Sequence, residues 1–200
     1  MGSAASFDFK PFNTLRKRWL HTYNISPFGG DKREGAGVEN YFFNRLLAPA
    51  RVARDHMAME FINPPDAELR AILKRPCTVA VVGCSDNPAR DSLRIAKLLK
   101  GRGFKVIPVN PQLDADALQS ALGEKCYPDL ASIPEPIEMV DVFRRSEFVG
   151  EIVEAAIAKG ARVLWCQLGV INLDAARRAQ QAGMTVVMDR CPAIEYARLF

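Results

Sequence analysis

The sequence has few of the residues on which several common classes of protein depend. Its five cysteines include no pair at the C-x-x-C spacing of zinc or thioredoxin-type sites, and both histidines, His21 and His56, precede residue 66. An enzyme built from residues 66–200 would therefore work without a histidine base, nucleophile or metal ligand. We predict no catalytic residue and no metal site. An odd number of scattered cysteines is typical of free thiols and indicates a reduced, cytoplasmic protein.

Long apolar runs and a strong excess of charge are absent as well. No stretch reaches about 18 consecutive apolar residues, so no membrane span is predicted. Residues 66–200 carry 18 Lys and Arg against 17 Asp and Glu, although the whole chain has a formal net charge of +4. This balance lacks the clustered basic charge of nucleic-acid-binding proteins, and we predict no nucleic-acid partner.

Two regions of different character follow one another along the chain. Residues 1–65 hold 7 of the 11 phenylalanines and show no sustained hydrophobic period, and residues 24–37 are rich in glycine and other helix breakers. We predict an N-terminal extension of irregular and helical structure over 1–65, with short helices around 12–23 and 40–57. A regular domain is predicted over 66–200.

The second region alternates apolar strand patterns with helical ones. Such alternation predicts a doubly wound α/β fold with a parallel five-stranded sheet, because parallel neighbours need helical crossovers. Strands are expected at 78–82, 104–109, 137–143, 162–167 and 184–188. Helices are expected at 66–74, with Asp66 as its cap, and at 89–100, 147–159, 173–182 and 193–199.

The first strand leads into a turn suited to phosphate. Gly83 ends the apolar run, and a polar loop then enters a helix whose N–H groups and dipole favour an anion. The candidates here are Gly83, Cys84, Ser85, Asn87, Arg90 and Ser92. A second interpretation is an ordinary turn in which Ser85 or Asn87 caps the helix. The turn lacks the G-x-G-x-x-G spacing of dinucleotide-binding proteins.

The other predicted strands also end in residues suited to a nucleotide. In a doubly wound sheet these carboxyl ends form the ligand-binding edge. The candidates are Val109, Asn110 and Pro111 after the second strand, Phe143 and Arg144 after the third, and Gln167 and Gly169 after the fourth. A neutral Asn110 replaces the acid that usually binds the ribose of NAD, so NAD is disfavoured. After the fifth strand, Cys191 is either a buried structural thiol or a thiol of lowered pKa.

The order and spacing of five segments resemble the CoA-binding domain family: VAVVGCSDNPARDS, VIPVNP, GEKCYPDLASIPEPIEMVDVFRR, VLWCQLGV and TVVMDRCPAIEY. This family is the Rossmann-like nucleotide-binding module of the succinyl-CoA synthetase α subunit and also occurs as small standalone bacterial proteins. The likeness runs from about residue 68 to 199, and residues 1–60 have no counterpart in it.

The resemblance implies a Rossmann-like fold that binds coenzyme A (CoA). It implies that the loop after the first strand holds the CoA phosphates, that Val109, Asn110 and Pro111 lie by the adenosine, and that the ends of the third and fourth strands flank the nucleotide and the pantetheine. Standalone members often have Arg-Pro-Ser where this chain has Arg90, Asp91 and Ser92. The added carboxylate would repel a diphosphate unless it caps the helix or meets Arg94.

The predicted function is binding of CoA or an acyl-CoA without catalytic machinery. Synthetase activity by this chain alone is not expected, because the family's ligases phosphorylate a histidine in a second domain and no histidine follows His56. Two alternatives stay open. One is a CoA-dependent transferase or thiol-redox enzyme that uses Cys84 or Cys191. The other is an interaction subunit, with a protein partner or as a homodimer, that has lost ligand binding.

Overall fold

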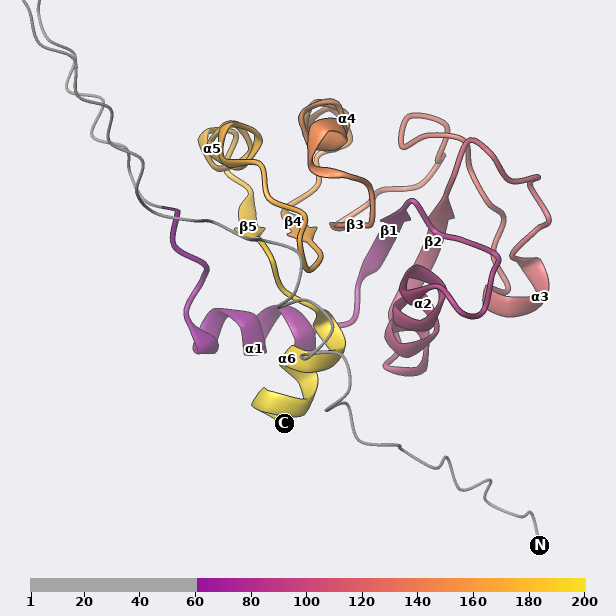
Figure 1. Ribbon diagram of the computed structural model, residues 1–200, viewed down its shortest axis with the longest axis horizontal. Coiled ribbons are helices and arrows are strands. Elements are labelled where there is room, and N and C mark those ends of the chain that lie inside the picture. Colours follow the sequence, from indigo (N-terminus) through magenta and orange to yellow (C-terminus); the bar gives the residue numbers. More distant parts are fainter. Residues whose placement is uncertain (1–60) are drawn as a thin grey trace, which may run out of the picture. The chain divides into compact units, whose positions relative to one another are not determined.

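The computed structural model describes residues 61–200, which belong to one unit of the chain, His56–Phe200. Five parallel strands form a single sheet in the order β2-β1-β3-β4-β5 (Figure 1). They are β1 (Thr78–Val82), β2 (Lys105–Val109), β3 (Met139–Val142), β4 (Val163–Cys166) and β5 (Thr185–Val187). The strands are almost continuously apolar because helices cover both faces of the sheet. The predicted Rossmann-like α/β fold is confirmed.

Helices form a layer on each side of the sheet. On one side lie α1 (Asp66–Lys74), α2 (Asp91–Gly101) and α6 (Pro192–Leu199), whose apolar residues share a core with Val79, Val81 and Trp165. On the other side, α4 (Val149–Ala158) and α5 (Leu173–Gln181) pack against Ala80, Val140 and other strand residues. Figure 1 shows these two layers with the strands between them.

Several predicted boundaries and one predicted role differ from the structure. Asp66 does not cap α1: Pro65 holds the cap position, and both carboxylate oxygens of Asp66 accept 2.6 Å hydrogen bonds from Arg198. The start of the predicted helix 147–159 is a separate 3-10 turn, η2 (Ser146–Phe148). Between the second and third predicted strands lies a short helix that was not predicted, α3 (Gln119–Leu122). The helices predicted around 12–23 and 40–57 lie outside the described residues.

The strand order places the ligand-binding edge at β1 and β3. The chain runs from β1 through α2 to β2 on one side of β1, and the later strands are added on the other side, beyond β3. In sheets of this order, ligands bind beyond the carboxyl ends of the strands where the direction of winding reverses, between β1 and β3. None of the helices over residues 61–200 is long and apolar enough to cross a membrane.

Candidate ligand site at the carboxyl ends of the strands

Gly83 brings the ends of β1 and β3 into close contact. Its φ is +87°, and its N–H donates to the Val109 carbonyl at 2.8 Å. A Cβ at this position would lie 3.3 Å from the Phe143 carbonyl carbon and 3.2 Å from Cδ of Arg144. Only glycine adopts such a φ without strain and leaves room for Arg144. Gly83, one of the candidates after the first predicted strand, therefore lies at the point where the winding reverses.

The loop after β1 is held in shape by its own short polar side chains. Ser92 accepts the Ser85 N–H at 3.0 Å, Ser85 accepts the Asn87 N–H at 3.1 Å, and Asn87 accepts the Ala89 N–H at 2.9 Å. Neither Ser85 nor Asn87 caps α2, so the alternative interpretation of this turn is wrong in that detail. The cap residue is Arg90, whose side chain makes no capping bond. The start of α2 is left open to an anion.

Asp91 stands where standalone members of the family often have proline, and its charge would repel a bound diphosphate unless it is compensated. Its carboxylate accepts a hydrogen bond from Arg94 at 3.0 Å, one turn along α2. Both side chains are solvent-exposed. The carboxylate therefore meets Arg94, which is one of the two arrangements that would reduce repulsion of a diphosphate.

Asn110 ties the ends of β1 and β2 together. Its amide nitrogen donates to the Cys84 carbonyl at 2.8 Å, and its amide oxygen accepts the Gln112 N–H at 2.9 Å. Its backbone N–H donates to Tyr127 at 2.8 Å. These bonds fix the loop after β1 relative to the loop after β2. Asn110 therefore supports the site through the loops that it joins.

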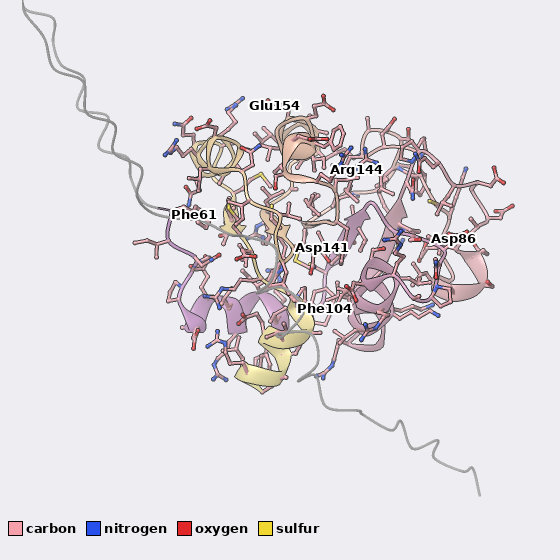
Figure 2. The ribbon with its side chains drawn as sticks, in the orientation of Figure 1. Phe61, Asp86, Phe104, Asp141, Arg144 and Glu154 are labelled. Carbon is pink, nitrogen blue, oxygen red and sulfur yellow. The ribbon has the colours of Figure 1, made fainter. Side chains whose placement is uncertain are left out.

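A pocket of about 220 Å³ opens beside Gly83 on the α4 side of the sheet. In the wall of the pocket, Arg144 lies over the ring of Phe148, with its guanidinium carbon 4.7 Å from the ring centre. Figure 2 shows Arg144 beside α4. The lining residues are Val82, Gly83, Val109, Pro111, Pro128, Asp129, Leu130, Arg144, Phe148, Glu151, Ile152 and Ala155. A mostly apolar wall with one stacked guanidinium suits a flat, anionic molecule such as a nucleotide.

The pocket contains some predicted residues and adds others. Gly83, Val109, Pro111 and Arg144 were predicted and line it. The remaining candidates lie outside its lining: Cys84, Ser85, Asn87, Arg90, Ser92, Asn110, Phe143, Gln167 and Gly169. Sequence analysis missed Phe148, although an aromatic residue soon after two arginines at a strand end is a usable signal. It also missed the segment 128–130, which lies far from the strand ends in sequence.

Residues that follow β4 form hydrogen bonds with the residues after β5 and with η2, and they do not line the pocket. The Gly169 N–H donates to the Asp189 carboxylate at 2.7 Å, and Asp189 itself has a φ of +55°. Ser146 accepts the Ile171 N–H at 2.9 Å. The amide nitrogen of Gln167 donates to Asp141 at 2.7 Å, inside the protein. Gln167 therefore faces the α2 and α6 side of the sheet.

Asp141 is a buried acid in the middle of β3 that the sequence analysis did not single out. Its side chain is fully buried, and burial raises its pKa to about 7 despite the hydrogen bond from Gln167. Among the described residues, its Oδ2 atom has no hydrogen-bond partner. The run 137–143 contains two acids, Glu138 and Asp141, and only Asp141 falls inside β3; an acid within this apolar strand was the available signal.

Burial disfavours the thiolate form of two thiols near the strand ends. Burial raises the pKa of Cys84 to about 12. Burial also raises the pKa of Cys191, although the N–H groups of Ile194 and Ala193 act in the opposite direction. The interpretation of Cys191 as a thiol of lowered pKa is therefore wrong.

Comparison with known proteins identifies the fold and its ligand class. Residues 77–197 match the family model described as "CoA binding domain". The chain belongs to this CoA-binding domain family. The uncharacterized protein YneT of Bacillus subtilis (strain 168) is 40% identical over 135 residues, which are 68% of this chain and 96% of YneT. The match supports CoA binding in general as the property of residues 77–197.

Two further relatives place the CoA-binding domain in different settings. The structure of a hypothetical protein from Pyrococcus horikoshii OT3 is similar with a TM-score of 0.63 and 40% identity, covering 70% of this chain and 99% of that one. The ADP-forming acetate–CoA ligase II of Archaeoglobus fulgidus is 33% identical over 89 residues, which are 44% of this chain but 12% of the ligase. The domain thus resembles both small proteins and one part of a large ligase.

Proposed function

We propose that residues 66–200 bind CoA or an acyl-CoA at the carboxyl ends of β1, β2 and β3 and perform no reaction on their own. The observation that carries this proposal is the close approach of Gly83 to Arg144, which lies between the loop that enters α2 and a pocket of about 220 Å³. Three groups of residues correspond to the three chemically different parts of the ligand.

The loop after β1 and the start of α2 suit the diphosphate. Backbone N–H groups at the first turn of α2 have no capping side chain from Arg90, and the helix dipole favours negative charge there. Arg90 is exposed at this end of the helix and can reach phosphate oxygens. Gly83, having no side chain, leaves room for Arg144 beside this loop.

The pocket suits the adenosine. Val109 and Pro111 offer an apolar floor, and Phe148 and Arg144 offer an aromatic ring and a planar cation. Stacking on a guanidinium or an aromatic ring is a common way to hold adenine. The neutral Asn110 after β2, in place of an acid, favours CoA over NAD.

The pantetheine arm is proposed to follow the edge beyond β3 and β4 near Gly169, whereas Gln167 is buried against Asp141 and does not contact it. The absence of a histidine after His56 and the raised thiol pKa values at Cys84 and Cys191 argue against catalysis. All five cysteines are free, which supports a reduced, cytoplasmic setting.

Isothermal titration calorimetry of the full chain with CoA tests the proposal, with 3′-dephospho-CoA and NAD as comparison ligands. We expect saturable micromolar binding of CoA and none of NAD. Arg90→Ala should weaken CoA binding about tenfold or more, because a charge-assisted hydrogen bond contributes about 1.5–3 kcal/mol. Arg177→Ala, on an exposed face of α5, is the matched control and should bind CoA as the unmodified chain does. Lack of CoA binding at millimolar concentration would overturn the proposal.

A further inference from the structure

Asp141 lies at the centre of the sheet, on the side on which the loop after β1 enters α2. It pairs in register with Val81 on β1 and with Trp165 on β4, both of which belong to the α2 and α6 side of the core. The indole N–H of Trp165 donates to the Arg190 carbonyl at 2.7 Å, next to the start of α6. Figure 2 shows Asp141 on the side of the sheet toward α6, away from Arg144.

One amide and three thiols interact with this carboxyl: Gln167 donates a hydrogen bond to it, and its charge raises the pKa of the three thiols. The three thiols are Cys84 in the loop after β1, Cys166 on β4 and Cys191 at the start of α6. The pKa of each thiol is raised, so all three are neutral at pH 7. Asp91, at the first turn of α2, raises the pKa of Cys191, as Asp141 also does. Within residues 61–200, no cation contributes to the shift in the Asp141 pKa. Burial raises this pKa, and only the hydrogen bond from Gln167 lowers it.

This environment leaves Asp141 poised between its two charge states. The ionised form has one oxygen that accepts from Gln167 and one that has no partner in the described part of the chain. The neutral form avoids a buried, half-satisfied charge. Small changes in the local electric field at the strand ends therefore change the fraction of Asp141 that is protonated.

We propose that ligand binding at the strand ends is coupled to the protonation of Asp141, so that CoA binds together with a proton. The inference rests on the proposed function, because it requires phosphate on the loop after β1. Cys84 belongs to that loop and interacts electrostatically with Asp141. Phosphate on the same loop brings negative charge toward the carboxyl and favours its neutral form.

The direction of the effect follows from linkage. If bound phosphate raises the pKa of Asp141, a protonated Asp141 must raise the affinity for phosphate by the same factor. One unit charge about 10 Å away, in an effective dielectric of about 20, changes a pKa by about one. The affinity for CoA should then fall about tenfold as the pH rises from about 6 to 9. At pH 7 binding should take up about 0.4 of a proton.

Proton uptake is measured by calorimetry of the full chain at pH 7 in buffers that differ in ionisation enthalpy. The primary ligand is 3′-dephospho-CoA, because its diphosphate does not titrate near neutral pH, whereas the 3′-phosphate of CoA does. We expect net uptake in the unmodified chain and no uptake in Asp141→Asn. Asp174→Asn, which removes an exposed carboxylate on α5, is the control and should take up as much as the unmodified chain.

The outcomes separate this inference from the proposed function. Binding of 3′-dephospho-CoA without proton uptake in the unmodified chain would overturn the inference and leave the proposed function intact. Absence of binding by both ligands at every pH would overturn both. Equal uptake in the unmodified chain and in a folded Asp141→Asn would assign the proton to another group and overturn the inference. If Asp141→Asn does not fold, carbon-13 NMR of the Asp141 carboxyl with and without ligand decides: the pKa must rise on binding.

Discussion

The two ends of the sheet differ in how their polar groups are satisfied. At the amino end, ion pairs join the segments that enter the strands, Arg75 with Glu138 and Lys105 with Glu135. At the carboxyl end, a pocket opens beside Gly83 and the start of α2 has no side-chain cap, and behind it, within β3, Asp141 has an unpartnered oxygen in the described structure. The amino end is therefore completed by the protein itself. The carboxyl end keeps features that a ligand can complete, which is the edge where doubly wound sheets bind ligands.

Two glycines with nearly the same φ give the strongest test of this difference. Gly83, at the carboxyl end, has a φ of +87°, and Gly103, at the amino end, has a φ of +90°. Alanine at 83 adds a contact with the Phe143 backbone at 3.3 Å, whereas alanine at 103 meets only Pro76 at 3.5 Å. Gly83→Ala should lower the free energy of unfolding by about 2–4 kcal/mol and abolish CoA binding. Gly103→Ala should cost about 1–2 kcal/mol and leave CoA affinity unchanged.

Urea unfolding gives the stability of both variants, and calorimetry gives their affinity for CoA. Equal loss of CoA binding in folded Gly83→Ala and Gly103→Ala would mean that backbone strain anywhere near the sheet disturbs the ligand site. The distinction between the two ends would then fail.

The buried carboxyl of Asp141 predicts a pH dependence that the amino end should lack. Its pKa is about 7 in the folded chain against 3.8 when unperturbed, so between these values the folded chain binds more protons than the unfolded one. Stability contributed by the neutral acid is therefore present below pH 4 and is lost as the pH rises to about 7. The loss is on the order of 4 kcal/mol, at about 1.4 kcal/mol for each pKa unit. Asp141→Asn should abolish this decline.

Urea unfolding at several pH values between 4 and 8.5 measures the effect. Glu138→Gln, at the amino end of the same strand, is the comparison and should keep the decline. An unchanged pH dependence in Asp141→Asn would show that Asp141 is ionised without cost, and would remove the physical basis of its poised state.

Replacing one arginine at each end of the sheet tests which end contributes to CoA binding. Arg144 covers Gly83 and stacks on Phe148, whereas Arg75 pairs with Glu138. Arg144→Ala should weaken CoA binding about tenfold to a hundredfold, the effect of losing a charge-assisted contact. Arg75→Ala should leave CoA binding unchanged, because exposed ion pairs contribute little. Equal affinities in the two variants would argue that the pocket does not hold the nucleotide.

The fold could be predicted because each strand is marked by its own local pattern. Apolar runs such as 78–82 are strands buried on both faces, and the glycine that follows β1 marks the turn toward α2. The same reasoning correctly placed Gly83, Val109, Pro111 and Arg144 together, since parallel strands share one carboxyl edge. Sequence and topology were enough for these residues.

The rest depended on side-chain directions that no local pattern reveals. Gln167 follows β4 as predicted, yet it faces Asp141 on the α2 and α6 side and lies away from the pocket. Asn110 follows β2, yet its side chain is bonded to the loops that it joins. Segment 128–130 reaches the pocket because the chain returns along β2, where Tyr127 bridges to Val109. These positions follow from tertiary packing.

Asp91 provides the smallest test, because its carboxylate stands at the start of α2, where phosphate is proposed to bind. Asp91 and Asp66 each occupy the first position of a helix, and each pairs with an arginine, Arg94 and Arg198 respectively. Asp91→Ser should raise CoA affinity twofold to fivefold by removing like charge near the diphosphate. It should also lower the stability by about 0.5 kcal/mol through the helix dipole. Asp66→Ser should lower stability without changing CoA affinity.

Calorimetry at low and high salt tests the cause of the change at Asp91. The gain in CoA affinity of Asp91→Ser should shrink as salt screens the repulsion, whereas a gain in affinity that is independent of salt would assign the gain to a rearranged loop.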